Sequence, residues 1–228
     1  MTPSAWRGRI PAFLERYLWF FEIAIREQVT RFGSLLPSGA LVLDAGAGEG
    51  QYRDSFSHCR YIGADLGIGD TGWNYAGLDV ICDLTRLPFS DKSFDACVNI
   101  VTLEHVRQPD AVLCELARTL KPGGQLFLVV PQDWEVHQAP HDFFRYTRYG
   151  VRHLLERAGF DDIRVEPGGG YFRLMGRRML NGLQFFKGIW ILPAALFLAP
   201  AGLLFPLLDG IDREKNFTLG YICWARKR

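Results

Sequence analysis

An acidic residue followed by regularly spaced glycines is the feature of this 228-residue sequence with the clearest chemical meaning. The apolar run Leu41–Leu43 leads into Asp44, and Gly46, Gly48 and Gly50 follow at every second position. Glycines let a backbone turn sharply and approach a ligand that a Cβ would obstruct. A carboxylate at this point would repel a pyrophosphate and attract a cationic sulfonium or ammonium group. The spacing also differs from the G-x-G-x-x-G of dinucleotide-binding loops, which argues against a nicotinamide-dependent reductase.

The block Leu41–Tyr52 resembles motif I of the class I S-adenosylmethionine (SAM)-dependent methyltransferases, which reads hydrophobic-hydrophobic-D-x-G-x-G-x-G. The resemblance extends over residues 41–130 and is nearest to the type 11, or UbiE-like, group. It implies that S-adenosyl-L-methionine is the cofactor and that Asp44 lies near its methionine end. Gly46, Ala47 and Gly48 would then pass close to the ligand. The alternative is a glycine-rich turn in which the acid only caps a helix.

A second acid marks the expected ribose side of the cofactor. Asp65 ends the strand-like run Arg60–Ala64, 19 residues after Gly46, where an acid can accept hydrogen bonds from both ribose hydroxyls. The resemblance assigns Asp65, together with the adjacent Leu66, to cofactor binding. The segment between this acid and the next strand is rich in glycine, so we expect a loop where the family usually has a helix.

The adenine side is assigned only through the resemblance. The stretch from Asp83 to Asp95 is similar to the family's D-(x)3-LPF-(x)3-SFD. It implies that Asp83 and Leu84 face the adenine, and Asn99, in the matching stretch that follows, is assigned to the cofactor as well. An ordinary turn residue is the alternative for the first of these, because aspartate is common where strands end.

Candidate acid–base residues follow the fourth and fifth strand-like runs. Methyl transfer is an in-line displacement, and an oxygen or carbon acceptor can need a base. His105 lies in the Glu104-His105 pair after the fourth run, and His141 lies beside Asp142 in the long segment Pro131–Thr147. We interpret His141, oriented by Asp142, as the first candidate base and His105 as the second, with a structural role as the alternative for each. No grouping of histidine, cysteine and acid has metal-ligand spacing, so no metal is expected.

Strand-like and helix-like segments alternate along the chain. This alternation predicts an α/β fold: a Rossmann-like, doubly wound, mostly parallel seven-stranded sheet, with a hydrophobic helical insertion before the last strand. The helical segments are predicted at Ile10–Phe32, Asp110–Leu120 and Thr147–Ala158, with a further helix opening near Gln51. The strand-like runs are Ala40–Leu43, Arg60–Ala64, Leu78–Cys82, Phe94–Val101, Gln125–Val130, Ile163–Glu166 and Thr218–Ala225.

The predicted organisation is an aromatic-rich N-terminal cap over residues 1–36 and a SAM-binding domain over residues 37–228, with the insertion at 171–210. The net charge of +1 provides no overall field for nucleic acid, so no nucleic-acid partner is expected. Five scattered cysteines without Cys-x-x-Cys and a start unlike a signal peptide indicate a cytoplasmic protein.

The segment Gly188–Leu208 carries no charge over 21 residues, which is long enough to span a membrane. Pro193, Pro200 and Pro206 lie within it, so we expect broken helices that form a hairpin on or in the membrane surface. Basic and apolar residues interleave just before it, as in membrane-interface helices. We therefore expect peripheral membrane contact through residues 171–210, at the inner face of the membrane.

The expected function is methyl transfer to a hydrophobic or lipid-linked small molecule at the membrane surface. One alternative is a soluble small-metabolite methyltransferase in which the insertion is a lid or a dimer contact, and the oligomeric state is left open. Another is a SAM-binding module without catalysis, because a fold alone does not determine function.

Overall fold

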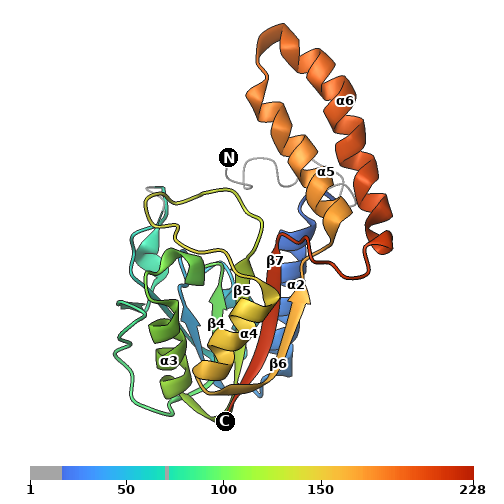
Figure 1. Cartoon of the computed structure of the whole chain (residues 1–228). Coiled ribbons are helices and arrows are strands. Elements are labelled where there is room, and N and C mark those ends of the chain that lie inside the picture. Colours follow the sequence, from blue (N-terminus) through green and yellow to red (C-terminus); the bar gives the residue numbers. More distant parts are fainter. Residues whose placement is uncertain (1–16, 70–71) are drawn as a thin grey trace. The chain divides into compact units, whose positions relative to one another are not determined.

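The chain forms two compact units in a computed structural model that describes residues 17–69 and 72–228 (Figure 1). The larger unit consists of residues 25–166 and 220–228. The smaller consists of residues up to 24 and residues 167–219, so it combines the N-terminal segment with the insertion. The boundaries inferred from the sequence, at 36 and at 171 and 210, stay predictions.

The larger unit is built on one seven-stranded sheet with the strand order β3-β2-β1-β4-β5-β7-β6. Neighbouring strands from β3 to β5 are parallel, and β7 is antiparallel to β5. The predicted Rossmann-like, mostly parallel sheet is therefore confirmed. The strands are β1 (Leu41–Ala45), β2 (Arg60–Asp65), β3 (Val80–Ile81), β4 (Phe94–Ile100), β5 (Leu120–Pro131), β6 (Phe160–Pro167) and β7 (Gly220–Lys227).

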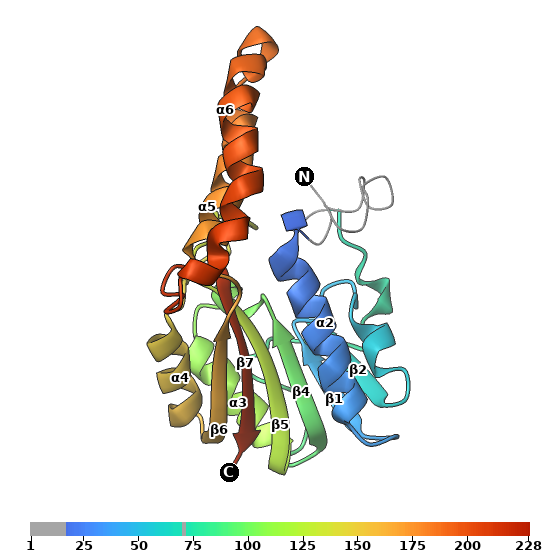
Figure 2. The same cartoon turned by 90° about the vertical axis from the view of Figure 1, so that its right-hand side faces the viewer.

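Helices cover both faces of the sheet (Figure 2). The helices α3 (Pro109–Thr119) and α4 (Arg148–Arg157) lie on one face, and their apolar residues join the buried cluster with those of β1, β4 and β5. The opposite face is covered by α2 (Phe20–Leu35), whose Phe32 ring packs 5.5 Å from the ring of Phe127 on β5. Burial of these apolar faces is the main source of stability for such a layered fold.

The predicted end of the N-terminal helix differs from the structure. The helix α2 continues past Phe32 to Leu35, because Gly33 serves packing and does not end the helix. A Cβ at Gly33 would lie 2.3 Å from the backbone oxygen of Ser55, so only glycine allows this approach. The predicted start at Ile10 lies outside the described residues.

The helix expected near Gln51 is only a 3-10 turn at Arg53–Phe56. Gly48 and Gly50 have positive φ values of 55° and 75°, which a right-handed helix cannot contain. Few residues then remain before β2 begins, so the crossover has no room for a longer helix.

The smaller unit contains a helical hairpin of α5 (Tyr171–Gly182) and α6 (Ile191–Leu204), which lie side by side in both views (Figures 1 and 2). Glycines permit the close approach: a Cβ at Gly176 would lie 2.7 Å from Pro206, and one at Gly202 would lie 2.6 Å from Leu180. The helix α6 is extended by 3-10 turns into a helical segment at Gly188–Ile211.

The predicted breaks at the three prolines were therefore wrong. Pro193 lies in the first turn of α6, and Pro206 is the second residue of the following 3-10 turn, positions where a missing N–H costs little. Only Pro200 is inside the helix. The hairpin is closed by Asp209, a buried residue that accepts hydrogen bonds from the backbone N–H groups of Gly170 and Arg173 at the start of α5.

Candidate functional site

The glycine loop after β1 is held in a conformation that only glycine adopts easily. Gly46 has a φ of 91°, and a Cβ there would lie 2.3 Å from Cγ2 of Thr102, the second residue after β4. The backbone N–H groups of Gly46 and of the buried Ala47 donate to the carbonyl of Ala64, at 2.7 and 3.2 Å. The loop therefore lies at the carboxyl edge of the sheet, where open α/β folds bind ligands.

Asp44 is buried beneath this loop. Its side chain is 1% exposed, and the hydroxyl of Tyr61 donates to Oδ2 of Asp44 at 2.6 Å. Burial raises the pKa of Asp44 to about 7, whereas the hydrogen bond from Tyr61 partly opposes that rise. Asp44 can therefore change charge near neutral pH, and a nearby cation would favour its ionised form.

Asp65, at the end of β2, ties the glycine loop to the segment that follows it. Its Oδ2 accepts from the N–H of Gly48 at 2.9 Å, and its Oδ1 accepts from the N–H of Gly67 at 2.8 Å. Each oxygen keeps a second lone pair, as a ribose ligand would need. The neighbouring Leu66 is exposed.

The expected loop after β2 is present, and Trp73 and Asn74 of this loop pack on the glycine loop. The described residues between β2 and β3 contain only a short 3-10 turn, Tyr75–Gly77. The indole of Trp73 would lie 3.1 Å from a Cβ at Gly48, and the N–H of Asn74 donates to the Glu49 carboxylate at 2.9 Å. Aromatic rings therefore line this side of the glycine loop.

The three remaining predicted cofactor residues lie in different environments. Asp83 is exposed, and its Oδ1 accepts from the backbone N–H and the hydroxyl of Thr85, both at 2.8 Å. Leu84 is buried in the main hydrophobic cluster. Asn99 is fully buried on β4, where its amide nitrogen donates to the carbonyl of Ala45 at 2.6 Å and joins β4 to β1. Their roles toward a cofactor stay predictions.

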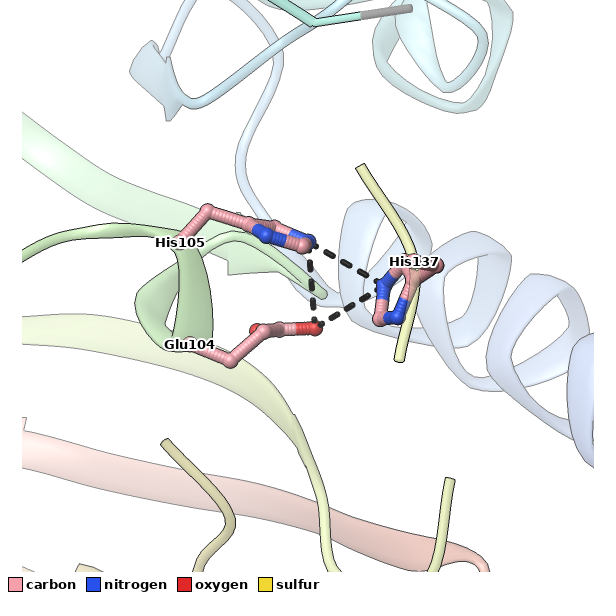
Figure 3. Close-up of side chains that lie close together, drawn as sticks. All are labelled: Glu104, His105 and His137. Atoms are coloured by element: carbon pink, nitrogen blue, oxygen red, sulfur yellow. Dashed lines mark hydrogen bonds and ion pairs between the residues drawn. The ribbon is translucent and has the colours of Figure 1, made fainter. Parts of the chain in front are cut away.

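On the acceptor side, the structure brings together Glu104, His105 and His137 (Figure 3). The first two form a 3-10 turn after β4, and His137 comes from the loop after β5. Nε2 of His105 lies 3.1 Å from Nε2 of His137, and these atoms lie 3.7 and 3.9 Å from Oε1 of Glu104. The sequence did not single out His137. The structure groups this residue with Glu104 and His105, and the expectation that no metal is bound stays a prediction.

Burial shapes the protonation of this cluster. The Glu104 side chain is fully buried, and burial raises its pKa to about 8. Burial also lowers the pKa of His105, because the imidazolium form loses hydration. Both pKa shifts thus favour the neutral form of the side chain.

Asp142 contacts Arg145 and His137, whereas the sequence predicted that it would orient His141. The Asp142 carboxylate forms two hydrogen bonds to Arg145, at 2.6 and 2.7 Å, which hold its pKa at about 2. The same carboxylate accepts from the backbone N–H of His137 at 2.9 Å and lies 3.4 Å from Nδ1 of that histidine. His141 contributes its backbone carbonyl, which accepts from Nδ1 of His105 at 2.6 Å. Asp142 therefore orients His137.

Comparison with known proteins agrees with this architecture. Residues 43–128 match a family described as a methyltransferase domain. The chain is 32% identical over 143 residues to the tRNA (carboxymethyluridine(34)-5-O)-methyltransferase of Arabidopsis thaliana, a match covering 58% of this chain and 33% of that protein. It is 36% identical over 102 residues to the demethylmenaquinone methyltransferase of Thermobifida fusca, covering 40% and 43%. The chain thus matches less than half the length of each of these relatives.

A solved structure shares the fold. The phosphoethanolamine N-methyltransferase 2 of Haemonchus contortus, in complex with S-adenosyl-L-methionine, superposes with a TM-score of 0.59 at 18% identity, over 90% of this chain and 52% of that one. With the strand order, the glycine loop and the matched residues in agreement, residues 43–128 are a methyltransferase domain of the type 11 family on the class I, Rossmann-like fold.

Proposed function

We propose that the chain is a SAM-dependent methyltransferase that acts on a hydrophobic or lipid-linked small molecule at a membrane surface. The glycine loop is the observation that supports a SAM-dependent methyltransferase. Its backbone has no room for a Cβ at Gly46, and its Gly48 N–H donates to Asp65. The loop lies within the matched methyltransferase domain. SAM would lie across this loop, with its methionine end toward Asp44 and its ribose toward Asp65. A solved relative in the same fold binds SAM, which supports this cofactor.

The reaction mainly requires the protein to align the acceptor with the methyl group of SAM. An acceptor atom attacks the methyl carbon of the sulfonium in line with the departing sulfur, and the products are the methylated acceptor and S-adenosylhomocysteine. The protein must hold the two reactants in that geometry and, for an oxygen or carbon acceptor, remove a proton. His105, His137 and His141 follow strands β4 and β5 at the carboxyl edge and supply candidate groups for this step.

The exposed apolar surface of α6 supports the membrane-surface acceptor. Among the described residues, one helical segment, Gly188–Ile211, is long and apolar enough to cross a membrane by length and composition. Only 6% of its most apolar window is buried, and Trp190, Leu196 and Phe197 are each at least 70% exposed. Isolated exposed apolar side chains are ordinary, but a continuous apolar surface of this length needs a covering partner. Two arginines of the adjacent α5 are paired within the protein, Arg177 with Glu22 and Arg173 with Asp209, so the proposal rests on the apolar surface of α6.

A second candidate, RNA methylation, is favoured by a different observation. The relative from Arabidopsis thaliana is named as a methyltransferase of a tRNA uridine, at 32% identity over 143 residues. There are two further alternatives. In one, the acceptor is a soluble metabolite and the hairpin is a lid or a dimer contact. In the other, the chain is a SAM-binding module without catalysis.

The deciding experiment incubates the protein with methyl-labelled SAM and a cell lysate, then separates lipid, RNA and small-molecule pools. Label in the lipid pool supports the full proposal. Label in the RNA or aqueous pool keeps the methyltransferase and removes the lipid acceptor. If the protein binds SAM but no pool becomes labelled, the non-catalytic SAM-binding module is favoured.

The membrane contact is tested separately by sedimentation with vesicles of phosphatidylcholine and phosphatidylserine. Phe197→Glu places a charge at a side chain that is 74% exposed, so it should weaken vesicle binding without disturbing the fold. Tyr149→Glu is the matched control, because Tyr149 is 76% exposed on α4, outside the hairpin. Equal vesicle binding by both variants and the wild type would remove the hairpin as a membrane contact.

A further inference from the structure

Three potential ligand atoms of the cluster defined by Glu104, His105 and His137 face one another across a space of ionic size (Figure 3). The two Nε2 atoms are 3.1 Å apart, and Oε1 of Glu104 is 3.7 and 3.9 Å from them. A point equidistant from these three atoms lies about 2.1 Å from each, which is the usual Zn–N and Zn–O bond length.

The hydrogen bonds of the two histidines fix where their lone pairs point. Nδ1 of His105 lies 2.6 Å from the carbonyl oxygen of His141, and Nδ1 of His137 lies 3.0 Å from the carbonyl oxygen of Glu135. A carbonyl oxygen only accepts, so each Nδ1 must carry a proton. In the neutral rings both Nε2 atoms are then acceptors, and they face each other with no hydrogen between them. This is the outer-shell pattern by which proteins orient metal-binding imidazoles.

The carboxylate of Glu104 completes the set of acceptors. Its side chain has no exposed area, and neither of its oxygens has a hydrogen-bond partner among the described residues. A buried carboxylate without a partner is strongly unfavourable unless another group satisfies it. Three convergent acceptors without a donor therefore need a cation, either a proton or a metal ion.

We propose that Glu104, His105 and His137 bind a divalent transition-metal ion. Two imidazole nitrogens and one carboxylate oxygen suit Zn²⁺, Mn²⁺ or Fe²⁺, whereas Mg²⁺ and Ca²⁺ prefer sets of oxygen ligands. Three protein ligands leave at least one position for water or an oxygen of a second ligand. The His137 side chain is 24% exposed, so the site is reachable from solvent.

The position of this cluster in the fold favours a role on the acceptor side. Thr102, two residues before Glu104, contacts Gly46 through a hydrogen bond of 3.2 Å from its hydroxyl to the glycine carbonyl. The cluster and the glycine loop are thus joined at the carboxyl edge of β1 and β4. The inference does not depend on the proposed methyl transfer, because it rests on the ligand atoms alone.

The test is a titration of the metal-free protein with Zn²⁺, followed by calorimetry and by elemental analysis after dialysis. The wild type should bind one ion in this site. Loss of an outer-shell partner typically weakens metal binding 10- to 100-fold, so loss of a ligand in His137→Ala should exceed about 100-fold. Glu104→Gln, which keeps the shape of the side chain, should also weaken binding. His153→Ala is the matched control, because His153 is exposed on α4.

Several outcomes would overturn the proposal. A wild type that takes up no Zn²⁺ would mean that the cluster holds a shared proton. Zn²⁺ uptake that His137→Ala and Glu104→Gln leave unchanged would place the ion elsewhere, for example on the exposed Cys114. Co²⁺ substitution separates these cases, because thiolate ligands give charge-transfer absorption that nitrogen and oxygen ligands lack. The Zn²⁺ titration uses no SAM, so failure of the methyltransferase proposal would leave its outcome unaffected.

Discussion

Replacing Tyr61 with phenylalanine should move the pH dependence of SAM binding to higher pH. The Tyr61 hydroxyl donates to the buried Asp44 at 2.6 Å and limits the rise of its pKa, which is about 7. A hydrogen bond to a charged group contributes roughly 1.5–3 kcal/mol. Since about 1.4 kcal/mol corresponds to one pH unit, its loss should raise the pKa of Asp44 by about 1 to 2.

The sign of the effect follows from the charge of the ligand. SAM carries positive charge on its sulfonium and amine, so ionised Asp44 should bind it better than protonated Asp44. At an effective dielectric constant of about 20, charges separated by roughly 6 to 12 Å interact by about 1.4 to 2.8 kcal/mol, which corresponds to a difference on the order of 10- to 100-fold. In the wild type, SAM affinity should therefore rise as the pH increases through about 7.

Folding stability should depend on the same group with the opposite sign. Asp44 has a pKa of 3.8 as its ordinary value and about 7 in the fold, so the folded chain keeps a proton that the unfolded chain has lost. The contribution of this group to the free energy of unfolding is complete below pH 3.8 and is lost as the pH rises through about 7. Binding and stability should thus change in opposite directions over one pH window.

The assay is calorimetric titration of SAM from about pH 6 to about pH 8.5 at constant ionic strength, with urea unfolding over the same range. Tyr149→Phe is the matched control, because Tyr149 is exposed. Tyr61→Phe should bind SAM more weakly near neutral pH and approach the wild type in alkaline buffer. The same midpoint in both proteins, or a loss of affinity that is equal at every pH, would refute the assigned role of Asp44.

Three further substitutions test the loop, the hairpin and the acceptor side. Gly46→Ala should abolish SAM binding and lower Tm, because its Cβ would meet Thr102, whereas Gly39→Ala, with a φ of 79° but open space, should cost only backbone strain of about 1 kcal/mol in urea unfolding. Gly176→Ala should separate α5 from α6 and speed proteolysis of the hairpin, whereas Gly182→Ala, whose Cβ would lie at an ordinary 3.5 Å from its nearest neighbour, should not. His141→Ala should keep SAM affinity and lose turnover, and full turnover in the label assay would make that histidine structural.

The position of Asp44, Gly46 and Asp65 at the carboxyl edge of the sheet could be predicted from the sequence because it is local, and their contacts with a cofactor stay predictions. Asp44 and Gly46 are separated by one residue, and their relation depends only on a strand that ends in a turn. Asp65 required one further inference, that the next strand ends at the same edge, and β1 and β2 are indeed parallel neighbours. The burial of Leu84 in the main hydrophobic cluster, by contrast, could not be inferred from the pattern.

The cluster of Glu104, His105 and His137 depends on tertiary structure that the sequence does not encode locally. His105 and His137 are 32 residues apart and meet because β4 and β5 are adjacent parallel strands. Arg145 holds the Asp142 carboxylate in place, and that carboxylate accepts a hydrogen bond from the backbone N–H of His137. The histidine of the second loop that enters the cluster is therefore His137 and not His141. The residues that follow neighbouring strands can be identified from the sequence, so the region of the cluster is predictable. The histidine that joins the cluster is not.

The order of the last two strands has an evolutionary consequence. The segment 167–219 begins where β6 ends at Pro167 and returns where β7 starts at Gly220, and β6 and β7 are neighbours in the sheet. Residues can therefore be gained, lost or exchanged between these two points without reordering any strand or shifting the register of β1, β2 and β4. Selection can thus alter the hairpin while the glycine loop and its acids stay under separate constraint.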